Sequence, residues 1–502
     1  MDISELPVPI RQRSLSYYLA LFCIVVPFCS TIPFAWLYVL YVVGTGTVWY
    51  ALNLSSTSKL LFPVALCEVL FSIYQYYLWR VVSPPAPYGP GDPGEIQAAF
   101  KRLLKSGLTP PTNGGDEGSH RPGSPEEDIV QLEFDDPRAI DFRNALRPWF
   151  GNATWSSIKL HQVHQWLYWS IYNADMPSYE SLTASQQAVM AGALNLLQKR
   201  CGCIFEEGSN PSVEIMRMTL DRANVILRPF TFYLAIFLTN LSLKKWFQYA
   251  WSVRFDHHNG LEYLIRIPKH WDPVTGPRPL VFIHGLGVGL LMYSNLFQHL
   301  LRQFLDRPIL ILLQPQITEC LANLLIELGW VYHDLTDGND TEREREIARS
   351  LVGKRRKGVT MLSHSKWSVG LASLTPLPSA PGRVMCATTS YIAAPEQQAI
   401  EVLMRYFVAT EIGVVNLLAR HFDWTSNTLW FEEIPNACDP TKSFFLLGGQ
   451  DSIIHSERVK RYLTSHGVKG GLWYDPVGSH GQALKPGTRG HLEILRWIRE
   501  EI

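Results

Sequence analysis

The sequence lacks an excess of charge of either sign. It has 502 residues, with 45 Lys and Arg against 45 Asp and Glu, so its formal net charge is zero. A protein that binds nucleic acid usually carries a basic face or stripe. The charge balance therefore argues against nucleic acid as a partner. The chain is also too long for one ordinary core, and its length predicts two to four folding units.

Cysteine is scarce as well, with 8 in the whole chain. Cys201-Gly-Cys203 has neither the spacing nor the partners of a zinc or redox motif. His161 and His164 lie one helical turn apart, but no cysteine or carboxylate accompanies them at ligand spacing, so a solvated helix face is the simpler interpretation. We expect no disulfide framework, no metal site and no cofactor.

Charge is missing altogether from Ser14 to Ser58. About 20 apolar residues cross the hydrocarbon core of a bilayer, so this stretch is long enough for two spans. Pro27 and Pro33 near its middle predict a break, with spans at Leu15–Thr31 and Pro33–Leu52. A signal peptide fits poorly, because no small-residue cleavage site precedes the second apolar run.

A third candidate span covers Leu60–Trp79 and is interrupted only by Glu68. Two arginines before the first span favour a cytoplasmic N-terminus, and three spans would then place the remainder on the luminal or outer side. The sequons at Asn152 and Asn339 would be usable there. The sequence predicts a multi-pass membrane anchor of two or three spans over residues 1–82, in a membrane whose identity stays open.

Composition divides the rest of the chain into three further parts. Residues 83–135 are rich in proline, glycine and polar side chains, which predicts a largely disordered linker, above all at 105–128. Residues 136–253 have helical periodicity and end in an apolar segment at 229–243 that is short for a span, so an interfacial or buried helix is expected. Residues 254–502 alternate strands with helices.

The strands of this last part are continuous apolar runs. We expect them at 259–268, 280–283, 307–315, 358–365, 442–451 and 471–476. Such strands, separated by helices, predict an α/β fold with a mostly parallel sheet covered by helices on both faces. In sheets of this kind, functional residues gather at the carboxyl ends of the strands.

Four of these strand ends carry groups suited to nucleophilic catalysis. The segment His284–Gly287 follows the strand at 280–283, and His480 follows the strand at 471–476. Ser365 and Asp451 stand at the ends of the strands at 358–365 and 442–451. A serine hydroxyl is a weak nucleophile until an imidazole takes its proton, and a carboxylate fixes the tautomer of that imidazole. The chain order Ser, Asp, His is one of the known orders for such a triad.

These residues resemble the α/β-hydrolase family over roughly 254–502, and in particular a group of membrane-anchored fungal members with hydrophobic N-terminal spans. The motifs "HGLG", "GGQDS" and "GSHG" carry the resemblance together, in order and at strand ends. The resemblance implies a membrane-anchored serine hydrolase of the esterase or lipase type that cleaves carboxylic esters. Lipid esters are one candidate substrate, and a lipid bilayer is the implied partner.

The resemblance also implies a role for each matching residue. The nucleophile would be Ser365, the acid Asp451 and the base His480. Backbone groups of Leu286 and Lys366 would form the oxyanion hole. Leu286 lies on an oxyanion loop with His284, Gly285 and Gly287, whereas Lys366 follows the nucleophile.

One position departs from the family pattern G-x-S-x-G. The chain has Ser363-His364-Ser365-Lys366-Trp367, with tryptophan where glycine normally lets a helix and a strand approach closely. A register centred on Ser368 restores the last glycine but puts lysine at the tight first position, so Ser365 is preferred. Two other functions stay open: an inactive scaffold of the same fold, and a membrane interaction protein that acts through the helices at 136–228.

Two alternative roles for carboxylates accompany this interpretation. Asp451 is a candidate cap for the helix that follows it. Asp475 is a rival acid, although it precedes His480 by only five residues and is expected in a turn.

Replacing the tryptophan of the elbow is the first test. Trp367→Gly is expected to raise ester hydrolysis or probe labelling at Ser365, because an indole there displaces the Lys366 N–H from the oxyanion position. Loss of one such donor costs roughly 10²–10³ in turnover in a well-studied protease. A paired assay of the two proteins, with Ser365→Ala as the blank, measures the effect. Brisk turnover by the unmodified protein that falls in Trp367→Gly would contradict this interpretation.

Overall fold

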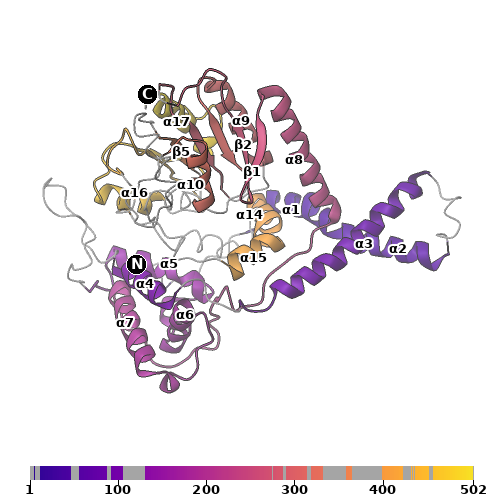
Figure 1. Ribbon diagram of the computed structural model, residues 1–502. Helices are drawn as coiled ribbons and strands as arrows, with labels where there is room; N and C mark the ends of the chain where they lie inside the picture. Colours follow the sequence, from indigo (N-terminus) through magenta and orange to yellow (C-terminus); the bar gives the residue numbers. More distant parts are fainter. Residues whose placement is uncertain are drawn as a thin grey trace, which may run out of the picture. The chain divides into compact units, whose positions relative to one another are not determined.

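The computed structural model describes residues 5, 12–46, 56–86, 92–105, 131–273, 275–285, 290–313, 318–331, 358–363, 398–421, 431, 434, 436–451 and 456–500. They form two compact units (Figure 1). Unit 1 comprises Met1–Ala235 with Val384–Ser426, and unit 2 comprises Ile236–Arg383 with Asn427–Ile502. The division predicted at residues 82, 135 and 253 is finer and stays a prediction. The stretch expected to be disordered, 105–128, lies outside the described residues apart from its first one.

The N-terminal apolar stretch forms one continuous helix from Leu15 to Gly44, and a second helix follows it. The first consists of α1 (Leu15–Ala20), a wide π turn η2 (Leu21–Val25) and α2 (Val26–Gly44), and the second is α3 (Ser56–Val82). Pro33 lies inside α2, so the break predicted between Leu15–Thr31 and Pro33–Leu52 is wrong. The π turn comes directly before the Val26-Pro27 step, where its wider ladder makes room for the proline ring.

The number of candidate spans changes with this continuity. Among the described residues, two helices are long and apolar enough to cross a membrane, Leu15–Gly44 with 30 residues and Lys59–Val82 with 24. The second coincides with the third span expected from the sequence. The bent pair Ala399–Ala409 with Ile412–Arg420 would be a third if the pair is one span. The number of crossings, and with it the luminal or outer placement of the remainder, stays a prediction.

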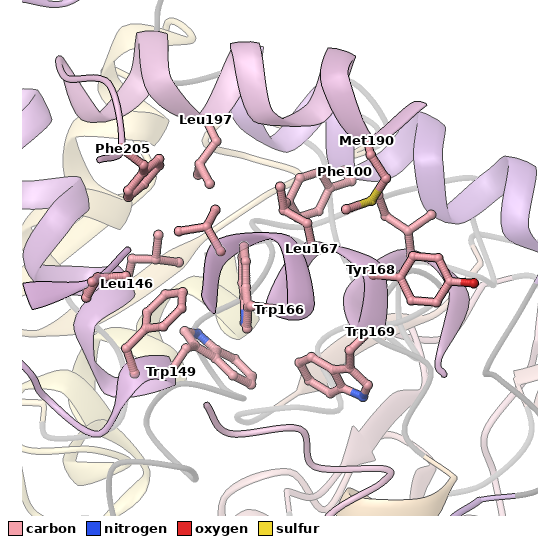
Figure 2. Packing of buried hydrophobic residues seen from close by; sticks show 14 of the residues in the cluster. Phe100, Leu146, Trp149, Trp166, Leu167, Tyr168, Trp169, Met190, Leu197 and Phe205 are labelled. Atoms are coloured by element: carbon pink, nitrogen blue, oxygen red, sulfur yellow. The ribbon is translucent and has the colours of Figure 1, made fainter. Parts of the chain in front are cut away.

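The helical module of unit 1 is built around tryptophans (Figure 2). Trp149, Trp166 and Trp169 are buried with Leu167 and Met190 in one apolar cluster. The central helix is buried on most of its sides, since all four residues from Trp166 to Trp169 are buried. The elements are α5 (Pro137–Leu146), η4 (Arg147–Phe150), η5 (Trp155–Ser157), α6 (Leu160–Tyr172), η6 (Tyr179–Ser181) and α7 (Ala184–Cys201).

The stretch expected as a linker, 83–135, contains a helix. This is α4 (Pro93–Lys105), in which Ile96, Phe100 and Leu104 recur every four residues and are buried. Phe100 and Leu104 belong to the tryptophan cluster. The expectation of a linker is therefore wrong for this part, because one apolar stripe is enough to dock a polar helix onto a neighbouring core.

Two further elements of unit 1 come from later in the chain. Helix α8 (Phe230–Trp251) contains all but the first residue of the apolar segment predicted at 229–243 and begins in unit 1. The helices α14 (Ala399–Met404) and α15 (Ile412–Arg420), with the π turn η8 (Arg405–Ala409) between them, form a pair bent by 80°. We call residues 398–421 the bent segment.

Unit 2 contains a mixed sheet. Its strands are β1 (Arg254–His258), β2 (Leu261–Arg266), β3 (Leu280–Ile283), β4 (Ile309–Leu312) and β5 (Thr360–Ser363), in the order β1-β2-β4-β3-β5. Strand β3 pairs parallel with both β4 and β5, whereas β2 pairs antiparallel with both β1 and β4. A separate parallel pair consists of β6 (Phe445–Gly448) and β7 (Leu472–Asp475). Each of the six strands expected from the sequence is present, and β1 is additional.

The antiparallel edge has a local cause. Asn259 and Gly260 join β1 to β2 and both have positive φ, 47° and 85°. A two-residue turn of this kind can connect only antiparallel strands, and Asn-Gly is its strongest sequence signal. The sheet is therefore less parallel than the continuous apolar runs predict.

Helices cover both faces of the five-stranded sheet. The end of α8, α9 (Leu290–Gln303) and α17 (Arg489–Glu500) pack on one face, around Phe247, Phe282 and Phe297. The other face packs against α10 (Thr318–Glu327) and Trp330. The sheet is thus buried on both sides, which leaves the strand ends as the accessible part. α16 (Ser456–Ser465) and the short turn η10 (Gln482–Leu484) complete the described elements of this unit.

Acid is expected to destabilise unit 2 through His491. Its side chain is fully buried in α17 against His299, and burial lowers its pKa to about 4. An unfolded histidine has a pKa near 6.5, so between pH 6.5 and 4 the unfolded chain takes up a proton that the folded chain does not. Stability should therefore fall as the pH drops through this window, by on the order of 2 kcal/mol.

Urea unfolding at pH 7.5 and 5.0 measures this effect. His491→Leu should lose most of the difference between the two pH values. His257→Leu, which replaces an exposed histidine of β1, should keep it. An unchanged pH dependence in His491→Leu would contradict the assignment.

Candidate functional site

Two neighbouring parallel strands lead into the predicted nucleophile and oxyanion segments. Ile283, the last residue of β3, is paired in register with Ser363, the last residue of β5. His284 and Gly285 follow β3 directly, and Ser365 comes two residues after β5. The two segments thus leave the sheet from adjacent strands, at the same edge.

The start of the predicted oxyanion loop is held by a tyrosine that belongs to none of the sequence motifs. The Gly285 N–H donates to the hydroxyl oxygen of Tyr293 in α9, at 3.0 Å. His284 is buried, and its Nδ1 lies 2.7 Å from the carbonyl oxygen of Gly285. Burial raises the pKa of Tyr293, which keeps this hydroxyl protonated. Tyr293 therefore fixes the backbone of the loop where it leaves β3.

Two glycines bring the ends of β6 and β7 into close contact. A Cβ on Gly448 would lie 2.5 Å from the carbonyl oxygen of Gly478, and one on Gly449 would lie 2.6 Å from that of Pro476. The turns are joined by backbone hydrogen bonds, from Gly449 N–H to Asp475 O at 2.6 Å and from Gln450 N–H to Gly478 O at 2.9 Å. Only glycine leaves room for this approach.

This approach brings Asp451 and His480 together. A carboxylate oxygen of Asp451, Oδ2, lies 2.8 Å from Nδ1 of His480. The Asp451 side chain is 8% exposed and that of His480 is 18% exposed. An imidazole that donates from Nδ1 carries its lone pair on Nε2, which is the tautomer that a general base needs. Gln482 supports the turn, since its Oε1 accepts the Ser479 N–H at 2.8 Å.

The alternative roles of the two carboxylates can now be compared. Asp475 Oδ1 accepts the N–H of Val477, at 3.2 Å, within its own turn. α16 begins at Ser456, five residues after Asp451. The described geometry thus associates Asp451, and not Asp475, with the imidazole.

Ser365, Lys366, Trp367, Leu286 and Gly287 lie outside the described residues. The roles of all eight predicted residues therefore remain predictions. Among the described residues, no group of three or more His, Cys, Asp or Glu side chains could hold a metal ion.

No family model and no curated protein matches this chain. It is similar to solved structures that are esterases and a phospholipase. An esterase from Pyrococcus furiosus is 11% identical, with 50% of this chain and 93% of that chain covered and a TM-score of 0.30. The esterase LipW from Mycobacterium marinum is 13% identical, with 54% and 88% covered and a TM-score of 0.31.

A structure described as a membrane phospholipase A and a bacterial virulence factor is 10% identical, with 54% of this chain and 94% of that chain covered and a TM-score of 0.31. Likenesses of this size carry no weight for the function, which is inferred from the residues above. The finer resemblance to membrane-anchored fungal proteins stays a prediction.

A single methyl group should disturb the turns that join Asp451 to His480. Gly448→Ala is expected to lower the free energy of unfolding by roughly 1–3 kcal/mol, the usual cost of overpacking. Thermal and urea unfolding in detergent measure the loss. Gly192→Ala in α7 is the control, since an added Cβ there meets nothing within 4 Å. Equal stability of Gly448→Ala and the parent protein would show that the turns do not need this glycine.

Proposed function

We propose that this chain is a membrane-anchored serine hydrolase that cleaves carboxylic esters by a Ser-His-Asp mechanism. The observation that supports it most is the hydrogen bond between Asp451 and His480 at adjoining strand ends. A half-buried imidazole oriented by a carboxylate is what activation of a serine hydroxyl requires. Ser365 is the proposed nucleophile, because it comes two residues after β5 in the sequence.

In the proposed reaction, Nε2 of His480 takes the proton of the Ser365 hydroxyl while the serine oxygen attacks the carbonyl carbon of the ester. The imidazolium gives that proton to the departing alcohol, and an acyl-serine remains. Water then attacks the acyl group with His480 again as the base, which releases the acid and restores the serine. Asp451 stabilises the imidazolium and holds the ring. The oxyanion would be bound by the backbone N–H groups of Leu286 and Lys366.

Lipid esters are the proposed substrates. The two helices that can cross a membrane, Leu15–Gly44 and Lys59–Val82, would keep the hydrolase beside a bilayer, where apolar esters partition. Each buried methylene contributes about 0.8 kcal/mol of transfer free energy, so longer acyl chains should be preferred over acetyl esters.

A catalytically inactive scaffold is the second candidate. It is favoured by Trp367, which stands where the elbow normally needs glycine. In this case the fold would be kept for binding, and Ser365 would not react with ester-like probes.

A fluorophosphonate probe distinguishes the two candidates. We expect the full-length protein in detergent to be labelled at Ser365, and Ser365→Ala to abolish labelling. Asp451→Asn should slow labelling strongly, since the corresponding change in a serine protease lowers turnover by roughly 10⁴. Asp475→Asn is the matched control and should label like the parent protein. No labelling of the parent protein, or equal slowing by both asparagine variants, would refute the proposed triad.

Tyr293 is proposed as a positioning residue for the oxyanion loop. Tyr293→Phe removes the oxygen that accepts the Gly285 N–H. One hydrogen bond is worth about 1 kcal/mol, so kcat should fall roughly five- to tenfold with little change in KM. Tyr263→Phe, at a buried tyrosine of β2, should leave both constants unchanged. A loss of stability without any change in kcat would assign Tyr293 a structural role only.

A further inference from the structure

We propose that helices α1 to α3 are a structural part of unit 1 and not a detachable tether, and that they hold the bent segment in place. The bent segment, 398–421, lies in the sequence between the proposed nucleophile Ser365 and the proposed acid Asp451. All the contacts concerned lie within unit 1. The proposal does not depend on hydrolysis.

Arg420 fastens the end of the bent segment to the end of α3. Its guanidinium is buried, with 5% of the residue exposed, and donates to the carbonyl oxygens of Val82 at 2.9 Å and Ser83 at 3.0 Å. It also donates to the carbonyl oxygens of Met218 at 2.7 Å and Asp221 at 2.8 Å. The last carbonyls of a helix have no partner within that helix, so Arg420 satisfies groups that α3 cannot satisfy itself.

Arg228 fastens the bend itself. Its guanidinium, 1% exposed, donates to the carbonyl oxygen of Thr410 at 2.6 Å and to the hydroxyl of Thr410 at 3.0 Å. Its backbone N–H donates to Oε1 of Gln75 in α3, at 3.0 Å. Thr410 lies between η8 and α15, where the helix is interrupted. One residue therefore links the interruption in the bent segment to the side of α3.

Glu68 of α3 forms a further contact, in which a side chain of the membrane helix accepts hydrogen bonds from the start of α8. It lies in the apolar helix Lys59–Val82 and is 2% exposed. Its carboxylate oxygens accept the N–H groups of Phe230 at 2.5 Å and Thr231 at 2.8 Å, at the start of α8. A carboxylate in an apolar span is costly unless it has partners. Here the partners are the unpaired donors at the positive end of another helix.

Apolar packing completes the contact on the other membrane helix. Tyr17 and Val25 form a buried cluster with Val402 and Tyr406 of the bent segment. Phe28 packs edge-on against Phe407, with ring centroids 5.9 Å apart. Helix α14 thus lies along the first half of the helix Leu15–Gly44 (Figure 1).

Separation of the two parts would leave buried groups without partners on both sides. Glu68 and Gln75 would remain in an apolar helix without the backbone N–H groups that they accept. On the other side, those N–H groups at and before the start of α8 would lose their acceptors, and Arg420 would lose the carbonyl oxygens of Val82 and Ser83. A simple tether has no such mutual dependence. The structure therefore predicts that the membrane helices stay bound after the chain that joins them to the rest is cut.

Cleavage of the folded full-length protein tests this. A recognition sequence for a specific protease is inserted after Gly89, in the proline- and glycine-rich stretch between α3 and α4. The protein is cut in a mild non-ionic detergent and held by a tag at its C-terminus. We expect most of fragment 1–89 to be retained with fragment 90–502 through extended washing. Release of fragment 1–89 from the parent protein, while fragment 90–502 stays monodisperse, would overturn the proposal.

Variants show whether retention is specific. Arg420→Met, introduced into the same cleavable protein, should release fragment 1–89 several times faster than the parent. Arg461→Met, at an exposed arginine of α16, is the matched control and should behave as the parent. Equal retention in Arg420→Met and the parent would mean that the fragments only share a micelle, and would overturn the role of Arg420. If Arg420→Met yields only aggregate, Glu68→Gln is compared with the parent in the same way.

Discussion

Backbone groups that lie away from water need hydrogen-bond partners, and this requirement organises both units. In unit 1 the partners are long side chains from distant parts of the chain. Arg143 donates to the carbonyl oxygens of Phe134 and Cys201, and Arg420 does the same at the end of α3. Each arginine offers several donors in a fixed plane, so one side chain can join three or four segments at once. The helices of unit 1 are assembled as much by these contacts as by the tryptophan core.

In unit 2 the same requirement is met by the backbone itself. The turns after β6 and β7 approach so closely that their N–H and carbonyl groups bond to one another, which the glycines at 448 and 449 allow. The approach also sets the separation of Asp451 and His480, because each follows one of these turns by only a few residues. The geometry of the carboxylate and the imidazole is thus a consequence of backbone packing. The hydrogen bond between the two side chains would not by itself set this separation.

The sequence predicts features that depend on local composition and misses those that depend on distant contacts. Buried strands such as β3 and β4 are continuous apolar runs, so their positions could be predicted closely. The antiparallel pairing of β1 with β2 follows from the Asn259-Gly260 turn, which is a local signal. The continuous apolar runs predicted a mostly parallel sheet, and this turn was not set against them. Two prolines within Leu15–Gly44 predicted a break, because proline usually ends a helix. The helix is continuous instead, and a π turn accommodates one of the prolines. Tyr293 belongs to no motif, and its contact with Gly285 is visible only in the fold.

The hydrogen bond between Asp451 and His480 is better explained by chemistry than by stability. The two turns are already joined by their backbones, so the side-chain pair is not needed to hold β6 beside β7. Enclosing a carboxylate costs free energy that a pair of this kind only partly offsets. A fold kept only as a scaffold would have no reason to retain such a pair. Trp367 follows β5 in the sequence, whereas the proposed acid and base follow β6 and β7. The proposed acid–base pair and the proposed nucleophile thus belong to separate segments of the chain, and a change in the sequence of one segment need not alter the other.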